Sequence, residues 1–244
     1  MGQGKSLGVI PARYESKRFP GKALSDVGGI PLVISTYKNA MKANALSDVV
    51  IATDSVKIFD CAKENNANVF LSKKEHKSGT SRVCEVAEVY PEYEKFINIQ
   101  GDNPYVCSDN IELLCNNMKN NDYVYTLASK IINVDDLINN NLVKTILDKD
   151  GFAIYFSRTE IPFIRGVDKL EWTKNHVFLK HIGIYGYSKN VLLKIKNYEI
   201  SYLESLEKLE QLTWLYNNIL IKVIETEIDE ISIDCQEDLD GLIK

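Results

Sequence analysis

The sequence lacks long hydrophobic runs and has few of the residues that build metal centres. No apolar stretch approaches the roughly 18 residues that a membrane-spanning helix requires. The 244 residues include only three histidines and five cysteines. No two cysteines form a C-x-x-C pair; they lie at Cys61, Cys84, Cys107, Cys115 and Cys235. We therefore expect neither a membrane span nor a zinc site.

The isolated cysteines and the charge balance favour a cytoplasmic protein that acts on a small molecule. Cysteines without tight spacing are typical of reduced thiols in the cytoplasm. The 34 acidic residues outnumber the 29 basic ones, so the net charge is −5. Because phosphate-backbone binding requires a broad basic face, we expect no nucleic-acid partner, and we expect no membrane partner either.

No proline- or serine-rich linker divides the chain, and no internal repeat is present. A chain of this length can bury one substantial core. We predict one domain over residues 1–244, with a segment around 155–185 that extends from it.

Short apolar strands alternate with helical stretches in the first half of the chain. We expect strands at 7–10, 49–53, 68–72 and 95–100, and helices at 31–44, 56–66, 80–90 and 110–120. Repeated strand–helix units predict an α/β fold: a doubly wound, mostly parallel, Rossmann-like sheet with helices on both faces. In such sheets, ligands bind beyond the carboxyl ends of the strands.

The second half is less regular. We expect strands at 124–130, 143–148, 153–158, 181–188 and 221–227, a hairpin turn at 148–151, one helix at 205–218 and a short closing helix at 236–244. The pattern therefore indicates a mixed α/β domain rather than a purely repetitive one.

The loop after the first strand, IPARYESKRFPGKAL, is rich in cations. It carries Arg13, Lys17, Arg18 and Lys22, and Gly21 permits a positive φ or a close approach of the backbone. Arginine and lysine bind phosphates without changing protonation state. The loop is either a site for a polyanion such as a triphosphate or a solvated basic surface, and its position after the first strand favours the former.

Two aspartates follow apolar strands at distant points of the sequence. Asp102 lies in NIQGDNP, and Asp234 lies in SIDCQEDL. Mg²⁺ takes one or two protein carboxylates and fills its other positions with water and phosphate oxygens. The pair predicts a magnesium site, and the alternatives are a turn residue for Asp102 and a helix N-cap for Asp234.

A set of motifs occurs in the order and spacing typical of one enzyme family. The motifs are IPARYESKRFPGKAL, ATDS, HKSGTSR, NIQGDNP, LVKTILDKDG, YFSRTEIPFIR, KHIGIYGYS, LEKLEQL and IDCQEDL. The first alone indicates only the wider nucleotidyltransferase group. From about Val9 to Leu242, the whole set resembles 3-deoxy-manno-octulosonate cytidylyltransferases, the CMP-Kdo synthetases.

The resemblance implies a Mg²⁺-dependent reaction in the cytoplasm. CTP and 3-deoxy-manno-octulosonate (Kdo) give CMP-Kdo and pyrophosphate, for a bacterial lipopolysaccharide or capsule. The family forms homodimers, so the segment around 155–185 is expected at a dimer contact. No serine or cysteine nucleophile is required, because the hydroxyl of the sugar itself attacks the α-phosphorus.

The resemblance also implies roles for individual residues. Arg13 and Lys22 match phosphate-binding residues, with Arg18 assisting, and Asp102 and Asp234 match metal ligands. These two aspartates, Arg13 and Lys22 form the expected catalytic group. The other expected nucleotide contacts are Pro11, Ala12, Thr53, Asp54, Ser78 and Arg82. The expected sugar-acid contacts are Gln100, Arg158, His181, Glu210 and Gln211. Without the resemblance, Glu210 and Gln211 would be assigned to an exposed helix face and His181 to the core.

Two positions depart from the family pattern. The family has an acidic residue at the position of Ser81 and a glutamate at the position of Asn103. A related acid, such as 8-amino-Kdo or another activated acid, is therefore an alternative acceptor. A second alternative is a non-catalytic nucleotide-binding protein. The presence of both expected metal ligands, Asp102 and Asp234, argues against it.

Overall fold

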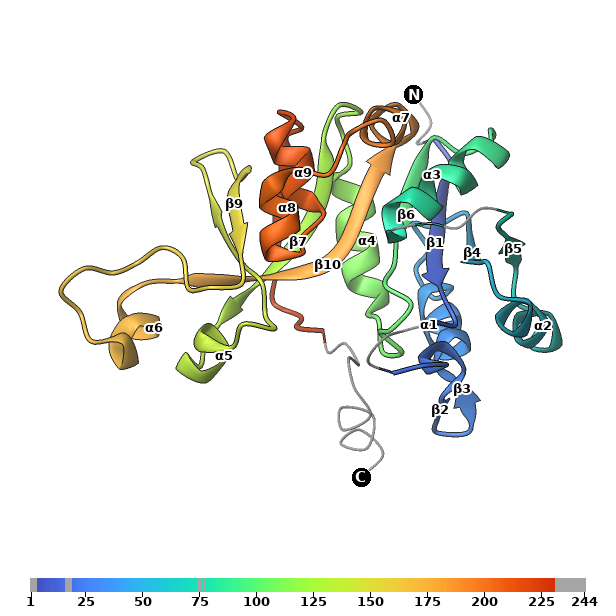
Figure 1. Ribbon diagram of the computed structural model, residues 1–244, viewed down its shortest axis with the longest axis horizontal. Helices are drawn as coiled ribbons and strands as arrows, with labels where there is room; N and C mark the ends of the chain where they lie inside the picture. Colours follow the sequence, from blue (N-terminus) through green and yellow to red (C-terminus); the bar gives the residue numbers. More distant parts are fainter. Residues whose placement is uncertain (1–3, 16–18, 74–75, 77, 231–244) are drawn as a thin grey trace.

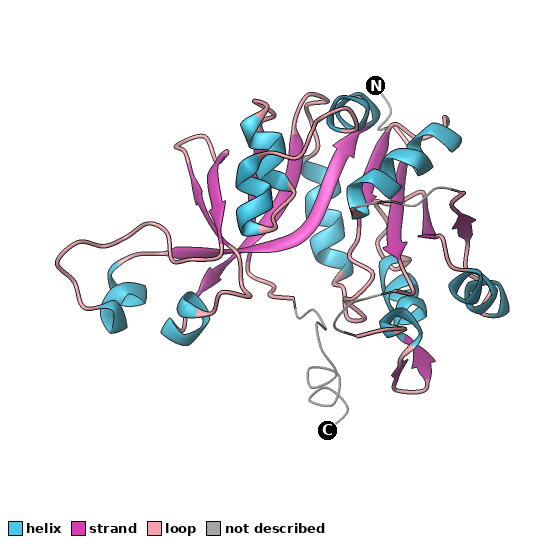
Figure 2. Ribbon diagram, viewed as in Figure 1, coloured by secondary structure: helices cyan, strands magenta, loops and turns pink. Residues whose placement is uncertain are grey.

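The protein is described from a computed structural model that covers residues 4–15, 19–73, 76 and 78–230. Within these residues, the main sheet contains nine strands (Figures 1 and 2). These strands are β1 (Ser6–Ala12), β4 (Asp48–Thr53), β5 (Val69–Leu71), β6 (Lys95–Asn98), β7 (Val124–Ile131), β8 (Lys144–Leu147), β9 (Ala153–Ser157), β10 (Phe178–Ser188) and β11 (Ile221–Thr226). Predicted helix 236–244, Asp234 and Arg18 lie outside the described residues.

Seven strands form the path β11-β7-β10-β6-β1-β4-β5. Neighbours along it pair in parallel except at β10, which is antiparallel to both β6 and β7. Strands β8 and β9 lie off this path as an antiparallel hairpin, and β8 also pairs with β10. The expected mostly parallel α/β sheet is confirmed.

Helices cover both faces of the sheet. Two separate apolar clusters result, because the buried strands present alternate side chains to opposite faces. One face packs against α3 (Gly79–Val89), α7 (Lys189–Ile195) and α9 (Gln211–Tyr216). The other face packs against α1 (Leu32–Ala40), α2 (Val56–Glu64) and α4 (Ser108–Asn117). The chain is therefore doubly wound, as predicted.

One end of the molecule projects away from the parallel strands (Figure 1). It contains the β8–β9 hairpin, the start of β10, α5 (Val134–Ile138), the 3-10 turn η2 (Lys169–Glu171) and α6 (Trp172–Asn175). A small apolar cluster of Ile131, Leu137, Trp172 and Phe178 packs inside this extension. Its expected role in dimerisation stays a prediction.

The predicted single helix at 205–218 is wrong. The chain forms α8 (Tyr202–Glu207), then a break, and then α9. Lys208 adopts a left-handed conformation with φ 56°, which ends α8 after Glu207. The leucine spacing suggested one helix because Leu209, Leu212 and Leu215 all contact one apolar cluster, whereas Leu206 of α8 is exposed.

A short hairpin, β2 (Asp26–Val27) and β3 (Ile30–Pro31), was not expected; it follows the 3-10 turn η1 (Lys22–Leu24). In the part of the chain that the structure describes, no helix is long and apolar enough to cross a bilayer.

Candidate functional site

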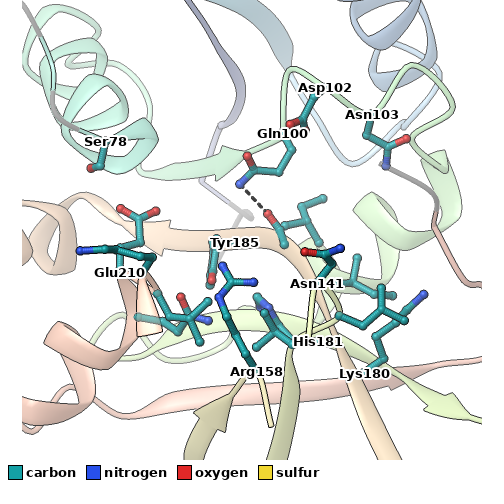
Figure 3. A pocket seen from close by; sticks show the side chains of 18 of the residues that line it. Ser78, Gln100, Asp102, Asn103, Asn141, Arg158, Lys180, His181, Tyr185 and Glu210 are labelled. Atoms are coloured by element: carbon teal, nitrogen blue, oxygen red, sulfur yellow. Dashed lines mark hydrogen bonds between the residues drawn. The ribbon is translucent and has the colours of Figure 1, made fainter. Parts of the chain in front are cut away.

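Two cavities adjoin the carboxyl ends of the parallel strands. The first, about 690 Å³, is lined by β10 residues from Lys180 to Tyr185 and is called the β10 cavity (Figure 3). The second, about 1170 Å³, is lined by the end of β1 and the basic loop and is called the β1 cavity. Both include Ser78, Gln100 and Asp102, so they meet at the end of β6. The motifs at distant sequence positions therefore converge on one site.

The β1 cavity contains most of the expected nucleotide contacts. Pro11, Ala12, Arg13, Lys22 and Arg82 line it, together with the shared Ser78. The loop turns back because Gly21 adopts φ 75° and its N–H donates to the carbonyl of Tyr14 at 2.9 Å. This positive φ favours glycine. The turn places Arg13 and Lys22 on the same cavity.

Gly101 allows the β6–α4 loop to approach β1. A Cβ at this position would lie 2.6 Å from the backbone carbonyl oxygen of Pro11, a distance that the packed backbone cannot accept. The approach brings Asp102 beside the basic loop, where Lys22 Nζ lies 2.8 Å from Asp102 Oδ2. The carboxylate and the phosphate-binding cation expected from sequence are therefore neighbours at the junction of the two cavities.

Arg82 is buried at the wall of the β1 cavity, with 3% of its surface exposed. Its Nη1 donates to the carbonyl of Ala12 at 3.1 Å, and its Nη2 donates to Asp54 at 2.5 Å. Burial lowers the pKa of Arg82, and the charge of Asp54 opposes this. Its Nε is buried and has no hydrogen-bond partner among the described residues.

Thr53 and Asp54 were expected to contact the nucleotide directly. Neither is among the described residues that line the two cavities. Thr53 is fully buried, and its hydroxyl accepts the N–H of Ser55 at 3.1 Å. Asp54 instead holds Arg82, so its geometry indicates an indirect contribution to the site.

All five residues expected to contact the sugar acid line the β10 cavity. They are Gln100, Arg158, His181, Glu210 and Gln211. Gln100 Nε2 donates to the carbonyl of Gly183 at 2.9 Å, the dashed bond in Figure 3. Arg158 extends toward the middle of the cavity from the opposite side (Figure 3).

His181 is a neutral group in this cavity. Burial lowers its pKa from 6.5 to about 3. Its Nε2 lies 3.0 Å from Thr126 Oγ1, and its ring packs edge-on against Phe156. The imidazole can therefore exchange hydrogen bonds with a hydroxyl group but carries no charge for a carboxylate near neutral pH.

Glu210 and Gln211 begin α9 and face the cavity. Burial raises the pKa of Glu210, while a hydrogen bond from Thr80 Oγ1 to Glu210 Oε1, 2.7 Å long, opposes the rise. Gln211 is only 3% exposed. Both side chains are suited to hydroxyl groups, because together they offer carboxylate and amide acceptors and one amide donor group.

The two departures from the family pattern have different structural consequences. Ser81 forms a reciprocal capping box with Ser78 at the start of α3. Asn103 is buried, and its Nδ2 donates to Glu230 Oε2 at 2.5 Å. Glu230 also lines the β10 cavity, so a carboxylate contacts position 103 although the residue itself is an amide.

Several residues that line the β10 cavity were not singled out from the sequence, among them Asn141, Lys180, Tyr185 and Lys208. Tyr185 lies four residues after His181 on β10, and their rings are 5.3 Å apart. Because alternate residues of a strand lie on the same face, the position of Tyr185 four residues after His181 could have predicted that both face the cavity. Lys208 was hidden inside the predicted continuous helix, although it lines both cavities.

The expected metal site is described only in part. Asp102 supplies a partly exposed carboxylate at the cavity junction. Among the described residues, no cluster of three or more histidine, cysteine, aspartate or glutamate side chains has metal-binding geometry. A single hard carboxylate beside the cations of the basic loop is compatible with Mg²⁺, which obtains most of its oxygens from water and phosphate.

Comparison with known proteins identifies similar sequences and structures. A family model described as cytidylyltransferase matches residues 7–226. The 3-deoxy-manno-octulosonate cytidylyltransferase of Thermodesulfovibrio yellowstonii is 40% identical over 95% of this chain and 94% of its own. That of Parabacteroides distasonis is 40% identical over 97% and 96%.

Solved structures agree with these sequence relatives. A CMP:2-keto-3-deoxy-manno-octonic acid synthetase complexed with CTP is 30% identical, with a TM-score of 0.90 and coverage of 98% of this chain and 97% of its own. A 4-diphosphocytidyl-2C-methyl-D-erythritol synthase from Anaerococcus prevotii shares the fold, with 15% identity, a TM-score of 0.63 and coverage of 99% and 97%.

Proposed function

The chain belongs to the 3-deoxy-manno-octulosonate cytidylyltransferase family, and we propose that it transfers CMP from CTP to the anomeric hydroxyl of Kdo. The hydroxyl oxygen forms a bond to the α-phosphorus, and the bond from that phosphorus to the β-bridging oxygen breaks. Pyrophosphate leaves, and the hydroxyl proton passes to solvent. The products are CMP-Kdo and pyrophosphate.

The β1 cavity is the proposed nucleotide site. Arg13 and Lys22 bind the triphosphate, and Arg18 assists them. Ser78, Arg82 and the backbone at Pro11 and Ala12 contact the rest of the nucleotide. Support comes from the cations that line this cavity in a chain of net charge −5. Neutralising and aligning the phosphates is the main task of an enzyme that catalyses such a transfer.

The β10 cavity is the proposed acid site. Arg158 binds the C1 carboxylate, because a guanidinium matches the planar geometry of that group. Gln100, the neutral His181, Glu210 and Gln211 bind sugar hydroxyls. The attacking hydroxyl then lies near Asp102, where the two cavities share residues.

Asp102 and Asp234 are the proposed ligands of Mg²⁺. The ion neutralises charge on the phosphates and acidifies the attacking hydroxyl when bound. Asp102 is suited to this role because its carboxylate lies at the junction of the two cavities, beside the basic loop that supplies Lys22.

We also propose a homodimer in the cytoplasm. Large apolar side chains are exposed on the extension and beside it: Ile132, Phe163, Leu170 and Val177. Large exposed apolar side chains on one part of a protein are typical of a protein–protein contact. The four cysteines that the structure describes are free thiols, which suits a reducing compartment. The molar mass in solution tests the dimer.

The junction of the two cavities at Asp102 is the observation that carries the proposed reaction, since it brings a triphosphate site next to an acid site. The test measures pyrophosphate release by the purified protein with CTP and Mg²⁺. Each reaction contains one sugar acid from a panel that includes Kdo, and a control reaction contains no acid. Release with Kdo, and a product with the mass of CMP-Kdo, is expected.

The same panel separates the alternatives. Release with an amino-substituted Kdo but not with Kdo would assign a different acceptor. Binding of CTP without release for any acid would identify a non-catalytic nucleotide-binding protein. Omission of Mg²⁺ is expected to abolish release, and full activity in a chelator would contradict the metal assignment.

A further inference from the structure

Lys144, the first residue of β8, is a fully buried lysine. Its ammonium donates to three backbone carbonyls: Asn139 at 2.9 Å, Leu142 at 2.8 Å and Arg158 at 2.6 Å. An ammonium has three N–H donors, so all three are used. The lysine therefore cross-links the loop before β8 to the residue that follows β9.

Both segments joined by Lys144 form part of the β10 cavity. Asn141, Leu142 and Val143 line it from the loop, and Arg158 lines it from the end of β9. Lys144 itself is not among the described residues that line this cavity. It acts behind the cavity wall and contacts the backbone of residues that reach the ligand.

Arg158 is held from the opposite side by Glu207, at the end of α8. Glu207 Oε2 accepts the backbone N–H of Arg158 at 2.9 Å, and Oε1 accepts Ser157 Oγ at 2.7 Å. The Arg158 peptide is thus fixed at its N–H by a carboxylate and at its carbonyl by an ammonium. Two buried or partly buried charges of opposite sign determine the position of one residue.

The guanidinium of Arg158 is also oriented. Its Nε donates to the carbonyl of Glu207 at 2.7 Å, and its Nη1 donates to the carbonyl of Asn140 at 3.2 Å. Asn140 and its carbonyl belong to the loop that Lys144 ties down. The Nη2 group has no partner among the described residues, and Arg158 points into the cavity (Figure 3).

We propose that Lys144 is a positioning residue for the acid substrate, fixing Arg158 and the 139–142 loop so that the guanidinium presents its free edge to a carboxylate. This proposal rests on the proposed role of Arg158 in acid binding. Lys144 touches neither nucleotide nor acid. Its effect is therefore confined to the β10 cavity.

Burial disfavours the charged form of Lys144, whereas nearby carboxylates favour it. Burial lowers the pKa of Lys144, and the like charge of Arg158 adds to this, whereas Glu160 and Glu207 oppose it. Lys169 is a second like charge, so two cations and two carboxylates act on the Lys144 ammonium. An apolar side chain of the same length would remove the Lys144 donor from three carbonyls, and only that of Asn139 would keep another, the N–H of Leu142, so the loop and Arg158 would shift.

The test compares Lys144→Met with Arg158→Ala, Glu207→Gln and the exposed control Lys130→Met. KM for the acid, KM for CTP, kcat and the far-UV circular dichroism spectrum are measured for each protein. For Lys144→Met, we expect KM for the acid to rise at least tenfold while KM for CTP changes less than twofold. Glu207→Gln is expected to shift the same KM by a smaller factor, and Lys130→Met to shift neither.

The outcomes separate this proposal from the one it rests on. If Arg158→Ala raises both KM values equally, the acid-binding role of Arg158 fails, and the role of Lys144 fails with it. If Arg158→Ala is acid-selective but Lys144→Met leaves KM for the acid unchanged, or raises both KM values equally, only the role of Lys144 is overturned. If Lys144→Met does not fold, Glu207→Gln decides: an acid-selective rise supports the proposal, and wild-type constants overturn it.

Discussion

Lys22 and Asp102 form an ion pair of 2.8 Å between Nζ and Oδ2, although they lie 80 positions apart in the chain. One belongs to the basic loop after β1, and the other to the loop after β6. Both side chains are partly shielded from solvent. The pair lies where the β1 cavity meets the β10 cavity, so the proposed roles of its two members predict effects on different steps.

Substitution of Lys22 by methionine removes a cation that we propose binds the phosphates of CTP. A hydrogen bond to a charged group contributes about 1.5–3 kcal/mol, so KM for CTP is expected to rise by roughly 10- to 100-fold. KM for the acid should change little. Steady-state kinetics with each substrate varied in turn measures this, with the exposed Lys42→Met as control. Equal rises in both KM values would contradict the phosphate role.

Substitution of Asp102 by asparagine keeps the side-chain size and removes the carboxylate. We expect kcat to fall by about 100-fold or more, with the circular dichroism spectrum unchanged. Affinity of the free protein for Mn²⁺, measured by electron paramagnetic resonance, should fall in parallel. A variant with wild-type kcat and Mn²⁺ affinity would rule out Asp102 as a metal ligand.

Gly101→Ala tests the close approach of the two loops. The added Cβ would lie 2.6 Å from the carbonyl oxygen of Pro11, so one backbone segment must move. Overpacking of this kind costs about 1–3 kcal/mol of stability, and displacement of Asp102 should lower kcat. Gly79→Ala is the matched control for stability, because its Cβ would meet Pro11 at an ordinary 3.5 Å. Equal denaturation midpoints for the two variants would contradict the steric argument.

The lowered pKa of His181 predicts that the stability of the folded protein depends on pH. Its pKa is lowered from 6.5 to about 3, so between these values the unfolded chain binds a proton that the folded protein does not. The contribution of His181 to the free energy of unfolding is full above pH 6.5 and is lost as the pH falls toward 3. The free energy changes by at most about 1.4 kcal/mol per pH unit. The raised pKa of Glu210 acts in the opposite direction.

Comparison with His181→Gln isolates this contribution. Urea denaturation at pH 5 and at pH 7 should show a larger loss of stability on acidification for the wild-type protein than for the variant. The same pH dependence in both proteins would show that His181 does not remain neutral when folded.

The sheet and the loops at its edge were predictable because their signals are local. The apolar strand of β1 is followed directly by the cations Arg13 and Lys22, and Asp102 follows β6. Strand order and the carboxyl-end rule then bring these loops together. Roles for Gln100, His181 and Glu210 came only from family resemblance, since an isolated polar residue gives no local signal.

The features that the sequence did not predict depend on contacts between distant segments or on the conformation of a single residue. The break at Lys208 depends on a single left-handed residue inside a leucine pattern that continues across it. The ion pair of Asp54 with Arg82 joins two elements, so the sequence placed Asp54 at a strand end without revealing its partner. The carbonyl contacts of Lys144 involve backbone atoms, which carry no sequence signature.

A crystal structure of the Asp102→Asn variant with CTP, Mg²⁺ and Kdo bound would test most directly whether nucleotide and acid meet at position 102. We predict the triphosphate against Arg13 and Lys22, the Kdo carboxylate on Arg158, and the anomeric hydroxyl facing the α-phosphorus. A nucleotide bound in the β10 cavity, or an acid bound away from Arg158, would contradict the proposed arrangement.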